Sequence, residues 1–457
     1  MSGRLSKSQV ENLQASQVHS TLGRVMLADG FDMVYDLDKS HGMRLHDKVT
    51  GKEYLDFFSF FGSWPLSHNH PKIVNDKKFL ESIAKVALHN PANSDVYTVE
   101  MAQFVATFER VAMPQEFKHL FLIQGGSNAV ENALKTAFDW KVRLNLSKGK
   151  GEKGKKILHF KEAFHGRGGY TLSLTNTQDP NKYKYFALFD EWPRVSNPKI
   201  EFPLNAENVA KAEKAEKAAL AHIHEILRKE GDDVAAILLE AVQSEGGDNH
   251  FRPEFWSALR DICNKNDVLF IADEVQAGMG LSGKFWAYQH YGAVPDIICF
   301  GKKAQVCGIM TTDRIDQVPD NVFKVSSRIN STWGGNLVDM VRSRKFLEII
   351  EEDRLIENAA QVGAYLLRKV EGLQKKYPQL VSNARGKGLI VAFDLPTEDV
   401  LGKVKNHVYN NGALLLSCGS TTIRFRPVLD CTMEAVDQMT LLLDGALGAV
   451  SSPKASL

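Results

Sequence analysis

The sequence contains few cysteines, and they form no pattern that would pair them or gather them around a metal ion. They are five, an odd number, widely spaced and never in a C-x-x-C arrangement: Cys263, Cys299, Cys307, Cys418 and Cys431. This spacing argues against a disulfide framework and against a zinc site. We therefore expect five reduced thiols in a cytoplasmic protein.

Long hydrophobic runs and an excess of one charge are also absent. The longest apolar runs, such as residues 234–239, are far shorter than the ~20 residues that cross a bilayer, and the N-terminal residues contain no apolar signal region. The net charge is +1, which gives no reason to expect nucleic acid or an anionic membrane as a partner. We expect a soluble, unexported protein.

The chain is long enough for more than one domain. It has 457 residues, of which 44% are hydrophobic and 24% charged, and these are ordinary values for a globular protein. From residue 72 onward, helical stretches alternate with short apolar strands, a pattern typical of an α/β fold whose parallel sheet is covered on both faces. We expect strands at residues 120–123, 157–160, 235–239, 268–272 and 297–299, and helices at 128–143, 206–229 and 253–264.

The two ends of the chain follow different patterns from the centre. We expect a polar helix within residues 1–28, a meander of strands at 33–37, 43–47 and 53–57, and, after residue 335, a long helix at 336–377, strands at 388–395 and 413–417, and a closing helix at 432–447. This predicts three parts: an N-terminal segment and meander (1–71), a large central domain (72–335), and a C-terminal segment (336–457) that joins the meander in a small domain.

The stretch FIADEVQAGMG, residues 270–280, ends a predicted buried strand with two carboxylates, Asp273 and Glu274. A lone aspartate there could simply form a turn or cap a helix. However, Lys302 follows another apolar run, and open α/β sheets bind ligands at their strand ends. An acid and an amine presented together suit pyridoxal phosphate, because one keeps the ring nitrogen protonated and the other forms a Schiff base.

Other glycine-rich and histidine-rich stretches are also candidates for ligand sites. The turn GGSN at residues 125–128 opens a helix and could hold a phosphate, or could be an ordinary strand-to-helix turn. Residues 278–284 spell G-x-x-x-x-G-K, but Phe285 stands where a P-loop needs Ser or Thr. No dinucleotide motif is present, and we expect His68 and His70 to be structural, since no cysteine or carboxylate cluster accompanies them.

Three runs together resemble the class III, pyridoxal-phosphate-dependent aminotransferases: D-E-V-Q-A-G-M-G, P-D-I-I-C-F-G-K and G-G-S-N-A-V-E-N-A-L-K. The resemblance covers nearly the whole chain. It implies a fold-type-I α/β architecture, with a large domain built on a mostly parallel sheet and a small α+β domain formed by both chain ends. Within the class, runs such as F-H-G-R-G-G-Y-T-L-S-L-T-N-T and N-S-T-W-G-G-N-L are most similar to the lysine-type members, the L-lysine 6-aminotransferases.

The resemblance implies roles for residues around the cofactor. Lys302 is expected to form the Schiff base and then to act as the base that moves the substrate proton. Asp273 is expected to pair with the pyridinium nitrogen and Gln276 with the ring oxygen. Lys303 should point to the opposite side of the chain and be structural.

The same resemblance implies how the rest of the cofactor is held. Gly126 and Ser127 are expected at the phosphate, where a helix N-terminus offers free N–H groups, and Phe164 is expected to stack on the ring. Thr332 is expected to reach the phosphate of a neighbouring subunit, which implies a homodimer with shared active sites.

Substrate choice depends on charge at the reacting carbon. The amine end of L-lysine has no carboxylate there, whereas glutamate and 2-oxoglutarate do. The related ω-aminotransferases use an arginine that a glutamate can mask, and the matching positions are Arg424 and Glu245, although each alone could be an ordinary ion-paired or solvated residue. Arg167 would bind the distal carboxylate, and Glu240 and Asn330 complete the expected substrate site.

The expected reaction transfers the ε-amino group of L-lysine to 2-oxoglutarate and gives L-glutamate and 2-aminoadipate 6-semialdehyde. Ala241 and Ser244 stand where the wider class commonly has Pro and Gly, and this departure favours the lysine type. The alternatives are another ω-aminotransferase acting on ornithine or 4-aminobutyrate, an aminomutase with the same fold, and a non-enzymatic cofactor-binding protein. The last is disfavoured because both Lys302 and Asp273 are present.

Overall fold

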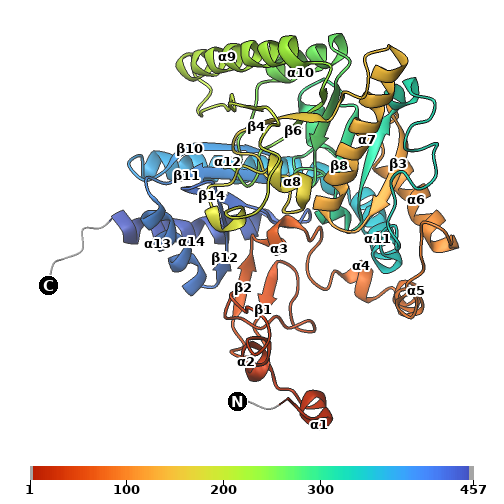
Figure 1. Cartoon of the computed structure of the whole chain (residues 1–457). Coiled ribbons are helices and arrows are strands. Elements are labelled where there is room, and N and C mark those ends of the chain that lie inside the picture. Colours follow the sequence, from red (N-terminus) through yellow and green to blue (C-terminus); the bar gives the residue numbers. More distant parts are fainter. Residues whose placement is uncertain (1–3, 452–457) are drawn as a thin grey trace.

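A seven-stranded sheet forms the centre of the molecule in the computed structural model, which describes residues 4–451 (Figure 1). In order across the sheet, the strands are β3 (Phe117–Ile123), β9 (Cys307–Thr312), β8 (Ile297–Phe300), β7 (Leu269–Asp273), β6 (Val234–Glu240), β4 (Lys156–Phe160) and β5 (Arg194–Val195). Strands β8, β7, β6, β4 and β5 run parallel, and β9 is antiparallel to both of its neighbours.

The central strands are buried along their whole length. Every residue of β6, β7 and β8 is buried, which explains their nearly continuous apolar sequences. The five strands expected in this region are confirmed to within a few residues. The antiparallel strand β9 and the short strand β5 were not predicted from the sequence.

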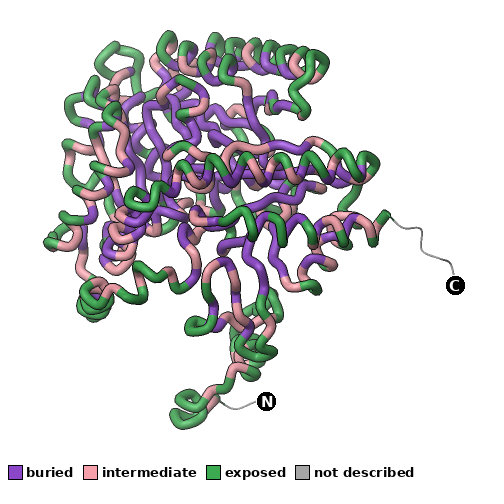
Figure 2. Tube along the Cα trace, turned by 180° about the vertical axis from the view of Figure 1, so that it is seen from behind, coloured by how far each residue is buried: buried purple, intermediate pink, exposed green. Residues whose placement is uncertain are grey.

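Helices cover both faces of this sheet. Apolar residues of α7 (Gly126–Ser147) pack on one face, and those of α6 (Val99–Val111), α10 (Pro253–Lys265) and α11 (Leu337–Glu352) pack on the other. The long α9 (Ala206–Glu230) lies along the outside near α10 (Figure 1). The buried chain is therefore concentrated in the sheet, while the outer helices are exposed along one side (Figure 2).

Two smaller sheets are built from the chain ends. One joins β1 (Arg44–His46), β2 (Glu53–Asp56) and β12 (Ala413–Leu414), with β12 parallel to β2. The other joins β10 (Ser382–Lys387), β11 (Ile390–Asp394), β14 (Thr422–Phe425) and β13 (Leu416–Cys418). Helices α12 (Leu355–Lys376), α13 (Glu398–Asn410) and α14 (Met433–Ser451) pack with them. The division of the chain at residues 71 and 335 stays a prediction.

Four expectations about the chain ends are wrong. The polar helix expected over residues 1–28 is, in the described part from residue 4 onward, three short helical segments at residues 7–11, 15–17 and 18–22. Residues 33–37 form no strand, and only Tyr35 bridges to Asp47. The helix expected at 336–377 is two helices, because Arg354 takes a left-handed φ of 52° between α11 and α12. Residues 413–417 are shared between β12 and β13, which belong to different sheets.

The remaining elements are short, except for α5. They are α1 (Lys7–Glu11), η1 (Ala15–Gln17), α2 (Val18–Leu22), α3 (Ser59–Gly62), α4 (Pro71–Val74), α5 (Lys77–Ala87), α8 (Gly169–Leu174), η2 (Pro180–Lys182), η3 (Ala287–His290), η4 (Lys302–Ala304) and η5 (Asp313–Gln317). No helix within residues 4–451 is long and apolar enough to cross a membrane.

The two histidines of the N-terminal region have local partners. Nε2 of His68 lies 2.9 Å from Oδ2 of Asp56 in a buried pair, and Nδ1 of His70 accepts a hydrogen bond from the backbone N–H of Lys72 at the start of α4. Both histidines therefore take part in local structural contacts.

Candidate active site

The carboxyl ends of β6, β7 and β8 lie side by side and bring the candidate residues together. Glu240 ends β6 and is in register with Asp273, which ends β7 and is in register with Cys299 of β8. Lys302 begins the turn η4 just after β8. Because parallel strands end at the same edge of a sheet, the acid and the amine meet there.

Lys302 is held in an unusual backbone conformation, with a left-handed φ of 48°. Its side chain is largely buried, and burial, followed by the positive charge of Arg424, lowers the pKa of its amino group, while Asp273 opposes this shift. A lowered pKa increases the fraction of neutral, nucleophilic amine at a given pH.

The side chain of Lys303 contacts the N-terminal region of the chain and not the candidate site. Its Nζ donates hydrogen bonds to the backbone carbonyls of Gly62 at 2.9 Å and Trp64 at 3.3 Å. Burial, followed by the nearby charge of Arg426, lowers the pKa of Lys303 to about 7. The predicted structural role is confirmed, since this amine anchors the segment after α3.

Asp273 has a buried histidine as its partner. Nδ1 of His165 lies 2.8 Å from Oδ2 of Asp273, and Oδ1 of Asp273 accepts the backbone N–H of Val275. The side chain of His165 is fully buried, and its Nε2 has no partner within residues 4–451. The pair fixes the orientation of the carboxylate. His165 was missed as a site residue, because only the fold brings it to Asp273.

Two arginines fix the side-chain amide of Gln276. Its Oε1 accepts a hydrogen bond from Nη1 of Arg424 at 2.7 Å and another from Nε of Arg426 at 3.2 Å. Arg426 is in turn held by Asp248 in an ion pair in which both side chains are fully buried. With its oxygen occupied, Gln276 is left with its NH₂ group to donate to a ligand.

The start of α7 is shaped to receive an anion. Gly125 precedes the helix with a φ of 89°, and no side chain caps the first turn. A Cβ on Gly126 would lie only 2.8 Å from Cγ1 of Val275, so a glycine is needed there. Ser127 Oγ lies 2.7 Å from Oγ1 of Thr171. Uncapped N–H groups at the positive end of a long helix suit a phosphate.

Glu240 holds the loop that carries Phe164. Its Oε1 accepts the backbone N–H of Phe164 at 2.9 Å, and its Oε2 accepts that of Ser244 at 3.1 Å. Burial, followed by the charge of Asp273, raises the pKa of Glu240 well above its usual range. Glu240 therefore positions Phe164 through the backbone.

Glu274, the second acid of the opening stretch, supports a turn as expected. Its two carboxylate oxygens accept the backbone N–H groups of Ala287 at 2.9 Å and Tyr288 at 2.6 Å, at the start of η3. Burial raises its pKa to about 8.

Glu245 and Arg424 do not form an ion pair in the described residues. Oε1 of Glu245 instead accepts hydrogen bonds from Oγ1 of Thr177 and Nζ of Lys182, each at 2.7 Å. Nε of Arg424 is buried and has no hydrogen-bond partner among residues 4–451. Lys182 was not expected in the site, because it follows α8 in a loop with no motif of its own.

Three further candidates have no hydrogen bond or ion pair to this cluster within residues 4–451. Arg167 is exposed and has no hydrogen-bond or ion-pair partner within residues 4–451, and Asn330 and Thr332 are exposed in the segment before α11. None of the three contacts Lys302 within the described part of the chain, so their expected roles stay predictions.

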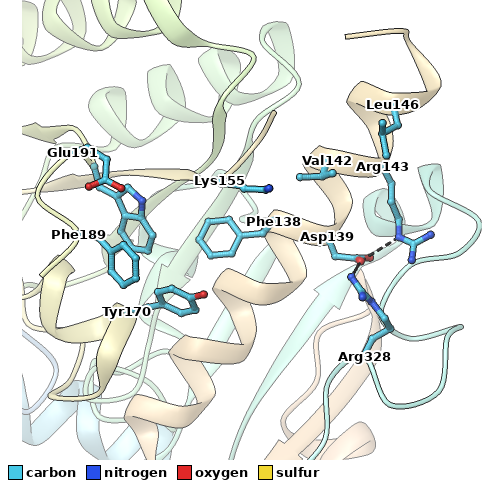
Figure 3. A pocket seen from close by; sticks show the side chains of 11 residues that line it. Phe138, Asp139, Val142, Arg143, Leu146, Lys155, Tyr170, Phe189, Glu191 and Arg328 are labelled. Carbon is cyan, nitrogen blue, oxygen red and sulfur yellow. Dashed lines mark hydrogen bonds and ion pairs between the residues drawn. The ribbon is translucent and has the colours of Figure 1, made fainter. Parts of the chain in front are cut away.

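A pocket of about 720 Å³ lies beside the C-terminal half of α7, and none of the candidate residues lines it. Figure 3 shows its wall of aromatic rings, with Arg143 and Arg328 both turned toward Asp139. Its lining is Phe138, Asp139, Val142, Arg143, Leu146, Lys155, Tyr170, Phe189, Glu191, Trp192 and Arg328. This pocket is therefore separate from the candidate active site.

The cluster around Lys302 fits pyridoxal 5'-phosphate. The cluster contains the amine of Lys302, whose pKa is lowered, and a carboxylate held by His165. It also contains an amide donor on Gln276 and the uncapped N-terminus of α7 beside Val275. Together with the seven-stranded sheet, these groups define a pyridoxal-phosphate-dependent transferase of fold type I.

Comparison with known proteins places the chain in one family. Residues 26–447 match the class-III aminotransferases, and the chain belongs to this family. Members of the family depend on pyridoxal phosphate, so the fold and the cofactor expected from the sequence are confirmed.

Several relatives are similar over nearly their whole length. An L-lysine-epsilon aminotransferase of Streptomyces clavuligerus is 45% identical over 446 residues, which are 97% of this chain and 97% of that protein. The mitochondrial 4-aminobutyrate aminotransferase of Sus scrofa is 31% identical over 447 residues, with 93% of this chain and 87% of that protein covered. The structure of a lysine aminotransferase from M. tuberculosis in the internal aldimine form has a TM-score of 0.94 and 45% identity, and the match covers 96% of this chain and 100% of that one.

Proposed function

We propose that this aminotransferase moves the ε-amino group of L-lysine to 2-oxoglutarate, giving L-glutamate and 2-aminoadipate 6-semialdehyde. The observation that carries the proposal is the greater identity to an L-lysine-epsilon aminotransferase than to a 4-aminobutyrate aminotransferase, sustained along the whole chain. The departures at Ala241 and Ser244 from the pattern of the wider class also favour the lysine type.

When bound, pyridoxal phosphate supplies a carbonyl carbon that takes up the amino group and a ring that spreads negative charge from the reacting carbon. Lys302 is the residue that moves the proton at the reacting carbon of the substrate. Its lowered pKa makes the neutral amine accessible, and its place at the carboxyl edge of the sheet puts it beside Asp273.

The other residues hold and orient the cofactor. Asp273, fixed by His165, would pair with the ring nitrogen, and the free NH₂ of Gln276 would donate to the ring oxygen. Phe164, held through its backbone by Glu240, would pack on the ring. The phosphate would lie at the uncapped start of α7, with Gly126 and Ser127.

Two arginines would bind the carboxylates that distinguish the two substrates. Arg424, with its buried and unpartnered Nε, would bind the carboxylate on the reacting carbon of glutamate or 2-oxoglutarate, and Arg167 would bind the distal carboxylate. Glu245 would mask Arg424 when the terminal amine of lysine enters, because that end carries no carboxylate. Asn330 would complete the substrate site.

We also propose a homodimer with shared active sites. Thr332 and Trp333 are exposed on this chain, and Thr332 does not reach the start of its own α7 in any described contact. A segment that serves the neighbouring subunit's phosphate would have these properties. Five unpaired, buried cysteines suit a reducing compartment and support a cytoplasmic location.

A panel of amines tests the function. We expect lysine to give the highest kcat/KM with 2-oxoglutarate as acceptor. If ornithine or 4-aminobutyrate exceeded lysine about tenfold, equivalent to roughly 1.4 kcal/mol in transition-state binding, the substrate assignment would be wrong. Turnover without 2-oxoglutarate would point instead to an aminomutase.

A further inference from the structure

The carboxylate of Glu245 is bound by residues other than its expected partner, Arg424. It accepts hydrogen bonds from Thr177 and Lys182, and the described chain shows no ion pair between Glu245 and Arg424. The backbone carbonyl of Glu245 accepts the N–H of Gly419 at 2.7 Å. This hydrogen bond holds the main chain at Glu245, so a change of partner would be a movement of its side chain.

Lys182 is well placed to hold this carboxylate. It ends η2, whose N-cap is Asp179, and its Nζ lies 2.7 Å from Oε1 of Glu245, 3.4 Å from Oγ1 of Thr177 and 3.9 Å from Asp179. The side chains of Lys182 and Glu245 are only 20% and 22% exposed, so water screens the pair less than at an open surface.

The ammonium group of Lys182 also lies at the edge of the cofactor site, because Nζ is 6.0 Å from the centre of the Phe164 ring. Lys182 thus joins the loop after α8 to the residue expected against the cofactor ring.

We propose that Lys182, together with Thr177, is a positioning residue that holds Glu245 away from Arg424 and so keeps the site open to the dicarboxylate co-substrate. The inference rests on the proposed function only in assigning Arg424 to the carboxylate at the reacting carbon. Glu245 has two alternative partners, and the balance between them sets which half reaction the free site favours. A ligand shifts such an equilibrium only through its differential affinity for the two states, and removal of Lys182 shifts it toward the masked one.

The test replaces Lys182 with Met, which keeps the length and removes the charge. We expect Lys182→Met to raise KM for 2-oxoglutarate about tenfold, the effect of losing one charged hydrogen bond, while KM for lysine stays the same or falls. Lys182→Arg should restore the wild-type values. Lys184→Gln is the matched control, because Lys184 lies two residues further on and its ammonium group lies over the Tyr185 ring, with no ion pair to a described residue.

A binding measurement separates this proposal from the proposed function. Glutarate, an unreactive dicarboxylate, is titrated calorimetrically into the holoenzyme, and we expect Lys182→Met to weaken its binding about tenfold. This result does not depend on which amine the enzyme prefers. In a Glu245→Gln background, Lys182→Met should add no further effect, since Lys182 acts through Glu245.

Two results would overturn the proposal. One is a glutarate affinity of Lys182→Met within twofold of wild type. The other is an equal loss with and without Glu245, which would mean that Lys182 contacts the ligand directly.

Discussion

The pair of His165 and Asp273 allows the most direct test of how the site is held. Replacement of His165 by Ala removes the donor 2.8 Å from Oδ2 of Asp273 and leaves this buried carboxylate oxygen without its partner. The loss of a hydrogen bond to a buried group costs about 1–3 kcal/mol. If that cost falls on the active state, kcat/KM decreases about 5- to 150-fold.

His165→Asn separates the hydrogen bond from the space that the ring fills, because an amide nitrogen can donate where Nδ1 does. We expect His165→Asn to recover at least part of the loss in kcat/KM and in cofactor affinity. His159→Asn is the matched control: His159 is also buried, and its Nε2 accepts a hydrogen bond from Nε of Arg194 instead of meeting Asp273.

The assay is kcat/KM for lysine, measured with saturating 2-oxoglutarate, together with the dissociation constant of pyridoxal phosphate. His165 would have no role in holding Asp273 if His165→Ala stayed within twofold of wild type in both quantities. The same conclusion would follow if His159→Asn lowered them as much as His165→Ala.

Three further outcomes follow from the buried charges. Lys302→Ala should lower the rate of amine transfer by about 10³-fold or more in a steady-state assay, because it removes the proton-moving base; a variant with near-normal turnover would exclude Lys302 from this role. Asp248→Asn should leave Arg426 buried with no anionic partner and lower the free energy of unfolding by about 3–5 kcal/mol in urea titrations, and an unchanged free energy of unfolding would contradict this. The pKa of Glu274 is raised to about 8 in the fold, so the folded state binds more protons than the unfolded state between about pH 4.5 and 8. The stability of wild type relative to Glu274→Gln should therefore fall as pH rises through this window, by at most about 1.4 kcal/mol per pH unit, and a difference independent of pH would contradict the assignment.

The central sheet could be predicted because its strands are buried on both faces. The apolar runs that became β6, β7 and β8 need no knowledge of their neighbours to be recognised as strands. The acid at the end of β7 and the amine after β8 could also be predicted to meet, since parallel strands end at a common edge.

The errors lie where local sequence does not decide the structure. Apolar residues recur at helical spacing on both sides of Arg354, so the sequence predicts one helix. Only the left-handed backbone of Arg354 separates α11 from α12. Residues 413–417 have one strand-like pattern, yet tertiary pairing divides them between two sheets.

The partners of the site residues were equally hidden. His165 and Lys182 are far from Asp273 and Glu245 in sequence, and no spacing rule connects them. The amide of Gln276 could be placed near the cofactor by resemblance, but its orientation is set by Arg424 and Arg426, which the fold brings in from the last third of the chain.

The pairing of β2 with β12 has a consequence for the order of folding during synthesis. Leu55 and Asp56 cannot find their parallel partners, Ala413 and Leu414, until nearly the whole chain has left the ribosome. The same N-terminal segment continues to Gly62. Its carbonyl accepts a hydrogen bond from the amine of Lys303, which is next to the reactive lysine in sequence. The seven strands of the large sheet all lie within residues 117–312 and can assemble earlier, whereas the N-terminal strand that leads to this contact completes its own sheet only after residues 413–414 have been made.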